Sequence, residues 1–356
     1  MSFQGFISRR SPAPAREAVR LTRPPVLRHC ERSGNRPFLD RGVSRSKGTG
    51  VNSQDEALLE LGRALRAAGY HFITVTPETH RRVNARRSSE EARSLRDVFG
   101  WNRPFTAGLL PSALLALLEG ARMVEKQPDG RLRSLVRYSS LGAGLYLHDA
   151  WPTSNTDAVF FGPDTYRFAS LLARVPGRFR RAVDVGCGSG AGGLSLADRV
   201  DSLVLADVNE RALRFSRINA ALNGVSHVQV LTSDALGGVP GEVDLVLANP
   251  PYMVDEASRT YRDGGGSHGV DLSVRFTREA LRRLSPGGTL VLYSGAPVVD
   301  GEDLLRAALV PVLGEARARF QYEELDPDVF GEELEQRPYA NVERIAVVSL
   351  VATRPV

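Results

Sequence analysis

The chain has 356 residues, of which 42% are hydrophobic and 24% charged. This length predicts two domains, or one domain with an extension, and the composition excludes a wholly disordered or collagen-like protein. No stretch approaches the roughly 18 consecutive apolar residues of a membrane-spanning helix. Two cysteines exclude a disulfide framework, so we expect a reducing compartment, the cytoplasm. The six scattered histidines lack the paired spacing of a zinc site, and we expect no metal.

The net charge of +5 is unevenly distributed along the chain. Residues 1–50 contain eleven Lys or Arg and three acidic residues, so they contribute +8 and the rest of the chain −3. The basic overall charge is therefore no argument for nucleic-acid binding by the folded part. The same residues contain five prolines and no lasting apolar period, which predicts a disordered basic tail or a translation start assigned too far upstream. A transit peptide and an RNA-contacting arm are the alternatives.

Residues 51–150 combine helical periodicity with a hairpin pattern. The predicted elements are helices at 55–68, 88–99 and 111–118, strands at 123–125 and 131–138 around a turn at 127–130, and a further strand at 145–147. We expect a small recognition domain of helices and a hairpin, with the pattern of a winged helix. Arg131, Arg133 and Arg137 alternate along one strand and so share a face, which either contacts phosphates or is simply solvated.

From residue 180 onward, strand and helix patterns alternate. The predicted strands are 182–185, 203–206, 228–231, 243–248, 289–293 and 344–351, and the predicted helices are 192–199, 210–222, 271–284 and 302–309. This alternation is typical of a parallel sheet covered by helices on both faces. We expect residues 151–356 to form an α/β domain that binds ligands at the carboxyl ends of its strands. The acid-rich segment 315–336 is expected at the solvated surface.

A glycine-rich turn, Asp184-Val-Gly-Cys-Gly-Ser-Gly190, follows the first of these strands. Its glycines are Gly186, Gly188 and Gly190. They let a ligand approach the backbone closely, which suits nicotinamide, flavin and S-adenosylmethionine (SAM) alike. Asp207, at the end of the second strand, can accept hydrogen bonds from both hydroxyls of a ribose. Asp234, after the third strand, can pair with the exocyclic amine of an adenine, so an adenosine-containing cofactor is predicted.

The fourth strand ends in Asn249-Pro-Pro-Tyr252, which hydride transfer by a dehydrogenase does not require. The glycine-rich turn, the two acids and this tetrapeptide, in this order, resemble the class I SAM-dependent methyltransferases that act on planar nitrogens, in particular the HemK/PrmC-type glutamine methyltransferases. The similarity extends from about residue 160 to 294. It includes the segments 218–220 with Asn223, 261–262, 266–271 and 284–288. It implies a Rossmann-like, doubly wound, mostly parallel seven-stranded sheet with SAM as the cofactor.

The resemblance assigns roles to the residues of the site. The three glycines and the acids, together with Asn249, bind the cofactor, with Asp184 at its ammonium group. The side-chain oxygen of Asn249 and the carbonyl of Pro250 each accept one N–H of the target NH2. Pro250 and Pro251 fix φ, so that this carbonyl is in place before the acceptor arrives. Tyr252 offers a flat face for packing, and the sulfonium is already activated, so no metal is required.

The implied acceptor is the side-chain amide of a glutamine in a protein, which is a translation release factor for the HemK/PrmC-type enzymes. Relatives with the same tetrapeptide methylate exocyclic amines of bases, so a nucleobase in RNA or DNA is the alternative acceptor. A silent SAM-binding subunit is a further alternative. We expect Asp164 and Tyr166 near the methionine end of the cofactor, and Arg262 and His268 in a loop that closes over the substrate. The oligomeric state is left open.

Overall fold

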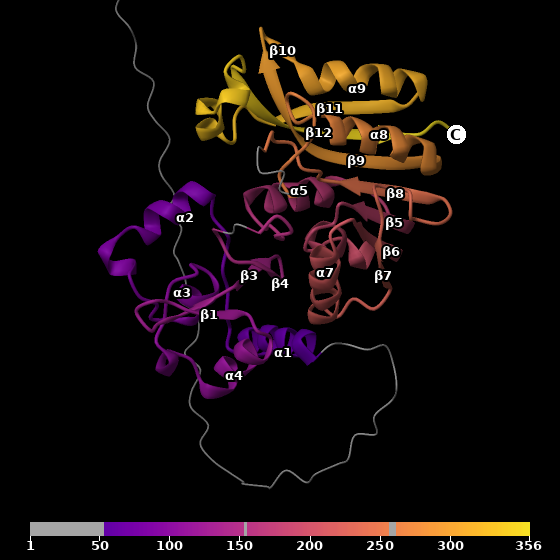
Figure 1. Cartoon of the computed structure of the whole chain (residues 1–356). Helices are drawn as coiled ribbons and strands as arrows, with labels where there is room; N and C mark the ends of the chain where they lie inside the picture. The colour runs from indigo at the N-terminus through magenta and orange to yellow at the C-terminus, as the bar shows by residue number, and fades with distance from the viewer. Residues whose placement is uncertain (1–52, 153–154, 256–260) are drawn as a thin grey trace, which may run out of the picture. The chain divides into compact units, whose positions relative to one another are not determined.

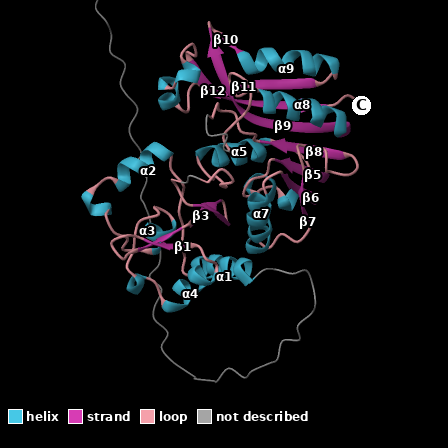
Figure 2. Ribbon diagram, in the orientation of Figure 1, coloured by secondary structure: helices cyan, strands magenta, loops and turns pink. Residues whose placement is uncertain are grey.

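The computed structural model describes residues 53–152, 155–255 and 261–356 (Figure 1). The prediction for residues 1–50 lies outside this described part. Helices and strands follow one another through the chain as Figure 2 shows, and the described residues belong to one unit by their contacts. Within these residues no helix combines the length and the apolar character that a membrane crossing needs.

The N-terminal part combines short helices with two hairpins. As described, it comprises α1 (Ser53–Ala67), α2 (Pro77–Asn84), α3 (Leu95–Phe99), α4 (Ser112–Gly120), the antiparallel pair β1 (Val124–Lys126) and β2 (Leu132–Ser134), and the antiparallel pair β3 (Val136–Leu141) and β4 (Gly144–Asp149). The first and third predicted helices, the hairpin and the strand at 145–147 are confirmed. The strand predicted over 131–138 is interrupted at Leu135, where β2 ends and β3 begins.

Two helices of this part differ from the predictions. The helix predicted at 88–99 is wrong over its first half, because Ser94 caps α3 and the N–H of Ala92 is bonded to the carbonyl of Pro104 instead. α2 is an additional helix. Its start carries a clear sequence signal, since the side chain of Thr76 accepts the N–H of Thr79 and Pro77 occupies the first turn.

The C-terminal part is built on a twisted sheet whose first strand lies in the middle. The spatial order is β11 (Arg319–Asp326), β12 (Arg344–Thr353), β9 (Leu284–Val299), β8 (Val243–Ala248), β5 (Phe179–Val185), β6 (Val200–Asp207) and β7 (Val228–Thr232), and the short β10 (Glu302–Asp303) pairs with β9. β12 is antiparallel to both neighbours, while β9, β8, β5, β6 and β7 are parallel. The predicted Rossmann-like, mostly parallel sheet of seven strands is confirmed, with β10 as an addition.

Helices cover both faces of this sheet. They are α5 (Pro163–Arg174), α6 (Ala191–Leu194), α7 (Glu210–Leu222), α8 (Asp271–Arg283) and α9 (Leu304–Glu315). Leu171, Leu194 and Leu213, from α5, α6 and α7, belong to the core on one face, and Phe276 and Leu309, from α8 and α9, belong to the core on the other (Figure 1). The sheet is thus buried on both sides, as its nearly continuous apolar strands predict.

β11 is a strand where the sequence predicts only an acidic surface. Its residues are mostly exposed, with Phe320 44% exposed, so the prediction of a solvated segment holds for this edge strand. Its first half, Arg319-Phe-Gln-Tyr-Glu323, alternates polar and apolar residues, a strand signal that the expectation of an acidic surface did not take into account.

α7 connects the two parts of the chain. Leu213 faces the sheet, whereas Phe215 and Leu222 pack with Leu58 and Leu118 in the core of the N-terminal part. A helix that buries two opposite faces holds its neighbours on both sides in place. The boundary expected near residue 150 stays a prediction.

Candidate active site

The register of the central strands places the glycine-rich turn beside the Asn-Pro-Pro-Tyr segment. β5 pairs with both β6 and β8, so the strand order reverses at this strand. Val185, the last residue of β5, is paired with Ala248, the last residue of β8. The chain segments that follow these two residues therefore leave the sheet side by side, at the kind of crevice where open α/β sheets bind ligands.

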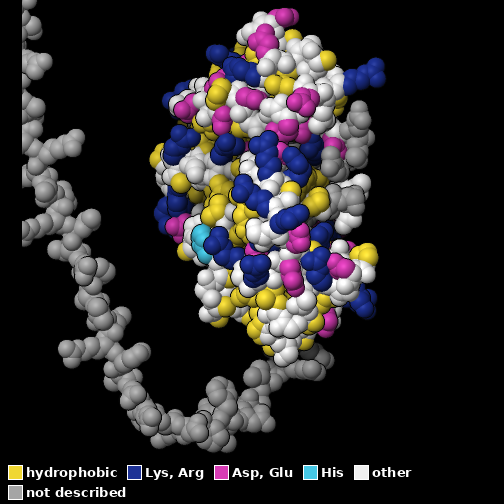
Figure 3. All heavy atoms as spheres, turned by 90° about the vertical axis from the view of Figure 1, so that its left-hand side faces the viewer, with side chains coloured by type: hydrophobic (Ala, Val, Ile, Leu, Met, Phe, Trp, Pro, Cys, Tyr) yellow, Lys and Arg dark blue, Asp and Glu magenta, His cyan; other side chains and the backbone are white. Residues whose placement is uncertain are grey.

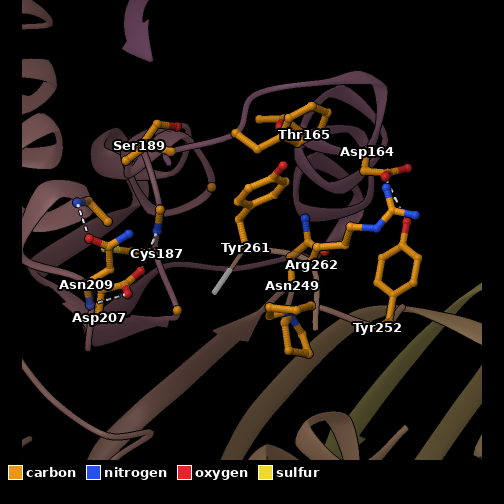
Figure 4. Close-up of a pocket in the computed structure, with 18 of the residues that line it drawn as sticks. Asp164, Thr165, Cys187, Ser189, Asp207, Asn209, Asn249, Tyr252, Tyr261 and Arg262 are labelled. Atoms are coloured by element: carbon orange, nitrogen blue, oxygen red, sulfur yellow. Dashed lines mark hydrogen bonds between the residues drawn. The ribbon is translucent and has the colours of Figure 1, made fainter. Parts of the chain in front are cut away.

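A pocket of about 280 Å³ occupies this position. Of the predicted site residues, those that line it are Asp184, Gly186, Gly188, Asp207, Asp234, Asn249, Pro250, Pro251 and Tyr252. Figure 4 shows Asp207 and Asn209 at one end, Asp164 and Tyr252 at the other, and Tyr261 between them. Residues as far apart in the sequence as Pro77 and Glu333 thus line one cavity.

The glycine-rich turn has the backbone that only glycine adopts readily. Gly186, Gly188 and Gly190 have φ of +67°, +53° and +77°. A Cβ on Gly188 would meet no protein atom within 4 Å, so this residue faces open space. Gly190 is not among the lining residues, and a Cβ there would lie 3.0 Å from Leu205. Close packing against β6 and α7 accounts for Gly190, and its part in cofactor binding stays a prediction.

The carboxylate of Asp207 is held in place by two backbone N–H groups, one of which belongs to the glycine-rich turn. One carboxylate oxygen accepts the N–H of Gly188 at 2.9 Å, and the other accepts the N–H of Asn209 at 2.9 Å. Burial raises the pKa of Asp207, and these backbone donors oppose the rise. Each oxygen keeps a second lone pair for a ligand in the pocket.

Asp184 is more deeply buried, with 3% of the residue exposed. One of its oxygens accepts the N–H of Gly193 at 2.7 Å. Burial raises the pKa of Asp184 to about 7, and the Asp207 carboxylate adds to the rise. A buried carboxylate of this kind is stabilised by a cation, which the described residues do not supply at this point.

Asp234 differs from the other two acids because it is exposed. Its side chain has 68% of its surface exposed and forms an ion pair with Arg275 at 2.7 Å, and Arg275 also contacts Glu279. The carboxylate therefore stands at the rim of the pocket rather than within it.

Tyr252 is anchored in the wall of the pocket. Its hydroxyl donates to Asp164 at 2.7 Å, and a Cβ on Gly295 would lie 2.3 Å from its ring. Burial and the Asp164 carboxylate hold the pKa of Tyr252 well above its usual value, so the hydroxyl remains a donor. Tyr293 also donates to Asp164, at 2.7 Å. Packing of an acceptor on the ring of Tyr252 stays a prediction.

Asp164 lies in the first turn of α5 and joins the segment 161–166 to the tetrapeptide. Asp164 and Thr165 line the pocket, whereas Tyr166 accepts the N–H of Thr74 in the N-terminal part at 2.9 Å. Asp164 is therefore in the pocket wall and Tyr166 is not among the lining residues, while the expected position of Asp164 near the methionine end of the cofactor stays a prediction. Tyr293 belongs to no recognisable sequence motif, and only its position in strand β9 brings its hydroxyl to Asp164.

The loop after the tetrapeptide folds back onto it. The N–H of Met253 donates to the carbonyl of Arg262 at 3.0 Å, and a Cβ on Gly264 would lie 2.0 Å from the carbonyl oxygen of Gly269. Arg262 lines the pocket and forms ion pairs with Asp255 and Glu333. His268 is not among the lining residues, and its ring contacts Ser267 at 2.9 Å.

Three aromatic side chains that the sequence did not single out for the site line the same pocket. The rings of Trp151 and Phe160 meet edge to face at 5.9 Å, and those of Phe160 and Tyr261 are stacked at 5.8 Å. Trp151 and Phe160 lie between β4 and α5 and belong to no recognisable motif. The wall that they form with Tyr261 suits a flat ligand.

Asn219 of α7 and Asn223, which caps the end of this helix, both bind the backbone of β4. Asn219 accepts the N–H of Leu147 at 2.7 Å and donates to its carbonyl at 2.9 Å, and Asn223 bonds both backbone groups of Leu145 at 3.0 Å. Their side chains thus act like the edge of a strand beside β4. Asn219 also donates to the carbonyl of Ser189 at 2.9 Å, and Ser189 lines the pocket.

The arginine face predicted along residues 131–137 does not exist. Arg137 is only 2% exposed, and Arg131 is paired with Asp129 at 2.6 Å. The strand is interrupted at Leu135, and its continuation β3 enters the core beside β4. On the face in Figure 3, basic and acidic side chains are interspersed. Residues 53–152, 155–255 and 261–356 contain no group of three side chains suited to hold a metal ion.

Comparison with known proteins gives one family. A family model described as a methyltransferase small domain matches residues 165–309. The ribosomal RNA large subunit methyltransferase G of Streptomyces coelicolor is 40% identical over 35% of this chain and 31% of its own length. The release factor glutamine methyltransferase of Borreliella burgdorferi is 28% identical over 33% of this chain and 45% of its own length.

A third relative is matched over most of its length. The release factor glutamine methyltransferase of Xylella fastidiosa is 31% identical over 204 residues, which are 54% of this chain and 73% of that protein. For the first two relatives, by contrast, this chain spans less than half of their length. The chain belongs to the class I SAM-dependent methyltransferases, among which it resembles the HemK/PrmC-type enzymes with an Asn-Pro-Pro-Tyr segment.

Proposed function

We propose that this protein transfers the methyl group of SAM to a planar NH2, and that the acceptor is the side-chain amide of a glutamine in a protein. One observation carries the proposal. The pairing of Val185 with Ala248 brings Asn249 and Pro250 to the same pocket as the glycine-rich turn. An NH2 held by the tetrapeptide then faces a cofactor bound at the turn.

The residues of the pocket fit SAM. Asp207 offers two fixed oxygens to the ribose hydroxyls, and the open space at Gly188 admits the cofactor close to the backbone. The buried Asp184 supplies the negative charge that an ammonium group requires. Asp234 lies at the rim, where an adenine amine can reach it. When bound, SAM supplies a methyl group on a positively charged sulfur.

The tetrapeptide orients the acceptor. An amide nitrogen is a poor nucleophile because its lone pair is delocalised into the carbonyl. The Asn249 side-chain oxygen and the Pro250 carbonyl accept the two N–H groups, which directs the lone pair toward the methyl group. Such positioning supplies roughly 7–11 kcal/mol of rate acceleration, and the two oxygens stabilise the positive charge that develops on nitrogen. The proton leaves after transfer, when the nitrogen is strongly acidic.

Charge favours a protein acceptor over RNA. The buried Arg137 and the paired Arg131 remove the basic face that a phosphate backbone requires. The edge strand β11 adds exposed carboxylates such as Glu323. Two of the reported relatives are named as methylating release factors, which makes a release factor the first candidate acceptor.

A nucleobase amine is the second candidate acceptor. The aromatic wall of Trp151, Phe160 and Tyr261 favours it, because bases stack on aromatic side chains. One reported relative is named as a ribosomal RNA methyltransferase. A silent SAM-binding subunit would have no use for Asn249 and Pro250 in the pocket.

The two acceptors are distinguished by incubating the protein with cell lysate and SAM that carries a labelled methyl group. We expect label that resists nuclease, is released by protease and yields methylglutamine after complete enzymatic digestion. The Asn249→Ala variant serves as the blank. Label that nuclease releases would show that the acceptor is a nucleobase and not a glutamine. Label no higher than in the Asn249→Ala blank would contradict methyl transfer.

SAM binding is expected to weaken in mild acid. Protonated Asp184 cannot pair with an ammonium group, so with a pKa of about 7 the dissociation constant is expected to be roughly eightfold higher at pH 6 than at pH 7.5. Isothermal titration calorimetry across this range measures the change. The Asp184→Asn variant is expected to bind weakly with little pH dependence. A flat profile for the unchanged protein would exclude Asp184 as the partner of the ammonium group.

Asn219→Ala is expected to raise the dissociation constant for SAM about tenfold, because the Ser189 carbonyl loses a donor that fixes the glycine-rich turn. Asn223→Ala is the matched control. Asn223→Ala removes an equivalent pair of hydrogen bonds to the backbone of β4 but no contact with the glycine-rich turn. The melting temperature is therefore expected to fall in both variants, and the affinity for SAM only in Asn219→Ala. Equal loss of affinity in the two variants would reduce Asn219 to a structural role.

A further inference from the structure

Arg262 is the cationic side chain of the active-site pocket. Among the described residues that line the pocket, it is the one Lys, Arg or His. The acidic side chains of the same wall are Asp164, Asp184, Asp207, Asp234 and Glu333. Figure 4 shows Arg262 at the end of the pocket that holds Asn249 and Tyr252. Its guanidinium is therefore placed for a contact with the methyl acceptor.

Two buried carboxylates balance the charge of Arg262. Its Nε lies 3.4 Å from Asp255, and one Nη forms an ion pair with Glu333. The side chains of Asp255 and Glu333 are only 4% and 8% exposed. One positive and two negative charges leave this group with an excess of negative charge. A further anion, such as the carboxylate of SAM, is therefore disfavoured beside Arg262, whereas a neutral hydrogen-bond acceptor is not.

The guanidinium keeps donors for a ligand. The side chain of Arg262 is 20% exposed in spite of its two ion pairs, and the residue lines the pocket. A guanidinium carries five N–H donors, more than the two carboxylate contacts engage. Nε is buried and has no hydrogen bond to a described residue, so the donors left for a ligand belong to the Nη groups.

The acceptor amide needs such a donor. In the proposed complex, the side-chain oxygen of Asn249 and the carbonyl of Pro250 receive its two N–H groups, which leaves the amide oxygen without a partner. A carbonyl oxygen that leaves water without gaining a hydrogen bond weakens binding. The hydroxyl of Tyr252 does not supply this bond, because it donates to Asp164 at 2.7 Å.

Glu333 comes from a segment outside the part of the chain that the family model matches, which ends at residue 309. It lies in the short 3₁₀ helix Gly331–Glu335, between β11 and β12. The side chain of Gln336 donates to Glu333 at 2.5 Å, and the hydroxyl of Tyr339 accepts the N–H of Val254 at 2.7 Å. These contacts fasten the connection between β11 and β12 to the loop after the tetrapeptide.

We propose that Arg262 donates a hydrogen bond to the oxygen of the acceptor amide, and that Asp255 and Glu333 position its guanidinium for this contact. The inference rests on the proposed function. Together with the two N–H contacts, this bond fixes the plane of the amide. The amide oxygen carries most negative charge before the lone pair of the nitrogen turns to the methyl group. Arg262 therefore strengthens acceptor binding and does not raise kcat.

The test measures initial rates over a dilution series of the methyl-accepting lysate fraction at saturating SAM. Arg262→Met keeps the length of the side chain and removes every donor. Its KM is expected to rise at least about tenfold, with kcat within about threefold of the unchanged protein. Its melting temperature is expected to fall, because two buried carboxylates lose their partner. Calorimetry is expected to give the dissociation constant of SAM within about twofold, which shows that the pocket has formed.

Two milder variants separate positioning from folding. Arg262→Lys keeps the charge between the carboxylates and one donor group but lacks the planar fork, so its KM is expected between those of the unchanged protein and Arg262→Met. Glu333→Gln is expected to raise KM by about threefold with unchanged affinity for SAM, because the guanidinium is less firmly held. If Arg262→Met does not fold, the KM of these two variants decides.

Arg103→Lys is the matched control. Arg103 is paired with Asp97 at 2.6 Å, its side chain is 12% exposed, and it is not among the lining residues. Its KM and kcat are expected to stay within about twofold of the unchanged protein.

Three results would overturn the inference. A normal KM in the Arg262 variants, while the unchanged protein methylates a protein, would contradict the role of Arg262 and leave the proposed function standing. Weaker SAM binding in the folded variants would assign the guanidinium to the cofactor. Label that nuclease releases, or no methyl transfer by the unchanged protein, would contradict the proposed function and the amide contact together.

Discussion

Asp207→Ala is expected to weaken SAM binding by at least about 100-fold. The substitution removes two oxygens that the N–H groups of Gly188 and Asn209 hold toward the pocket. A charge-assisted hydrogen bond to a ligand contributes about 1.5–3 kcal/mol. Loss of the two hydrogen bonds to the ribose hydroxyls is therefore expected to raise the dissociation constant more than about 100-fold. Isothermal titration calorimetry of the purified variant measures the loss.

Asp201→Ala is the control for this result. Asp201 lies on the same strand, β6, but its side chain is 66% exposed and far from the carboxyl end of the strand. SAM affinity is expected to stay within twofold of the unchanged protein. If Asp207→Ala also binds SAM normally while it remains folded, the cofactor lies elsewhere in the pocket and the ribose assignment is wrong.

Asn249→Ala is expected to bind SAM normally and to lose about 10²–10³ in kcat. The substitution deletes one of the two acceptors for the target NH2, and loss of a single preorganised polar group of this kind costs about that factor. The rate of methyl transfer to a lysate fraction that carries the acceptor measures kcat, and calorimetry measures SAM affinity. Separation of the two parameters distinguishes orientation of the acceptor from binding of the cofactor.

Asn249→Asp completes the comparison. An aspartate keeps an acceptor oxygen at the same position, so it is expected to recover part of the activity that Asn249→Ala loses. Full activity in Asn249→Ala would end the argument that this side chain orients an amide. Loss of SAM binding in both variants would instead make Asn249 chiefly a cofactor residue.

Local sequence patterns determined much of the sheet and of the cofactor end of the site. Asp184 and Asp207 are recognisable because they lie at the carboxyl ends of β5 and β6, and the glycines because they follow β5 directly. The carboxyl ends of parallel strands share one edge of the sheet. Helix starts were also encoded locally, even where the prediction missed them, as Thr76 and Pro77 show at α2. Such features depend on backbone geometry within a few residues.

The acceptor end depended on packing between distant segments. Asp164 receives hydrogen bonds from Tyr252 and Tyr293, and neither spacing nor composition predicts that meeting. Trp151 and Phe160 form a wall of the pocket although they belong to no motif. These residues find one another only when the sheet has formed.

The sequence by itself determined the α/β class, the glycine-rich turn and the Asn249-Pro-Pro-Tyr252 segment, because strand periodicity and turn chemistry are local properties. Only the tertiary structure decided that Arg137 is buried and that Asn219 reaches both β4 and Ser189. The alternation of Arg131, Arg133 and Arg137 in the sequence would be the same whether this strand were exposed or buried. Burial depends on which segments pack against a strand, and that is settled by the whole chain.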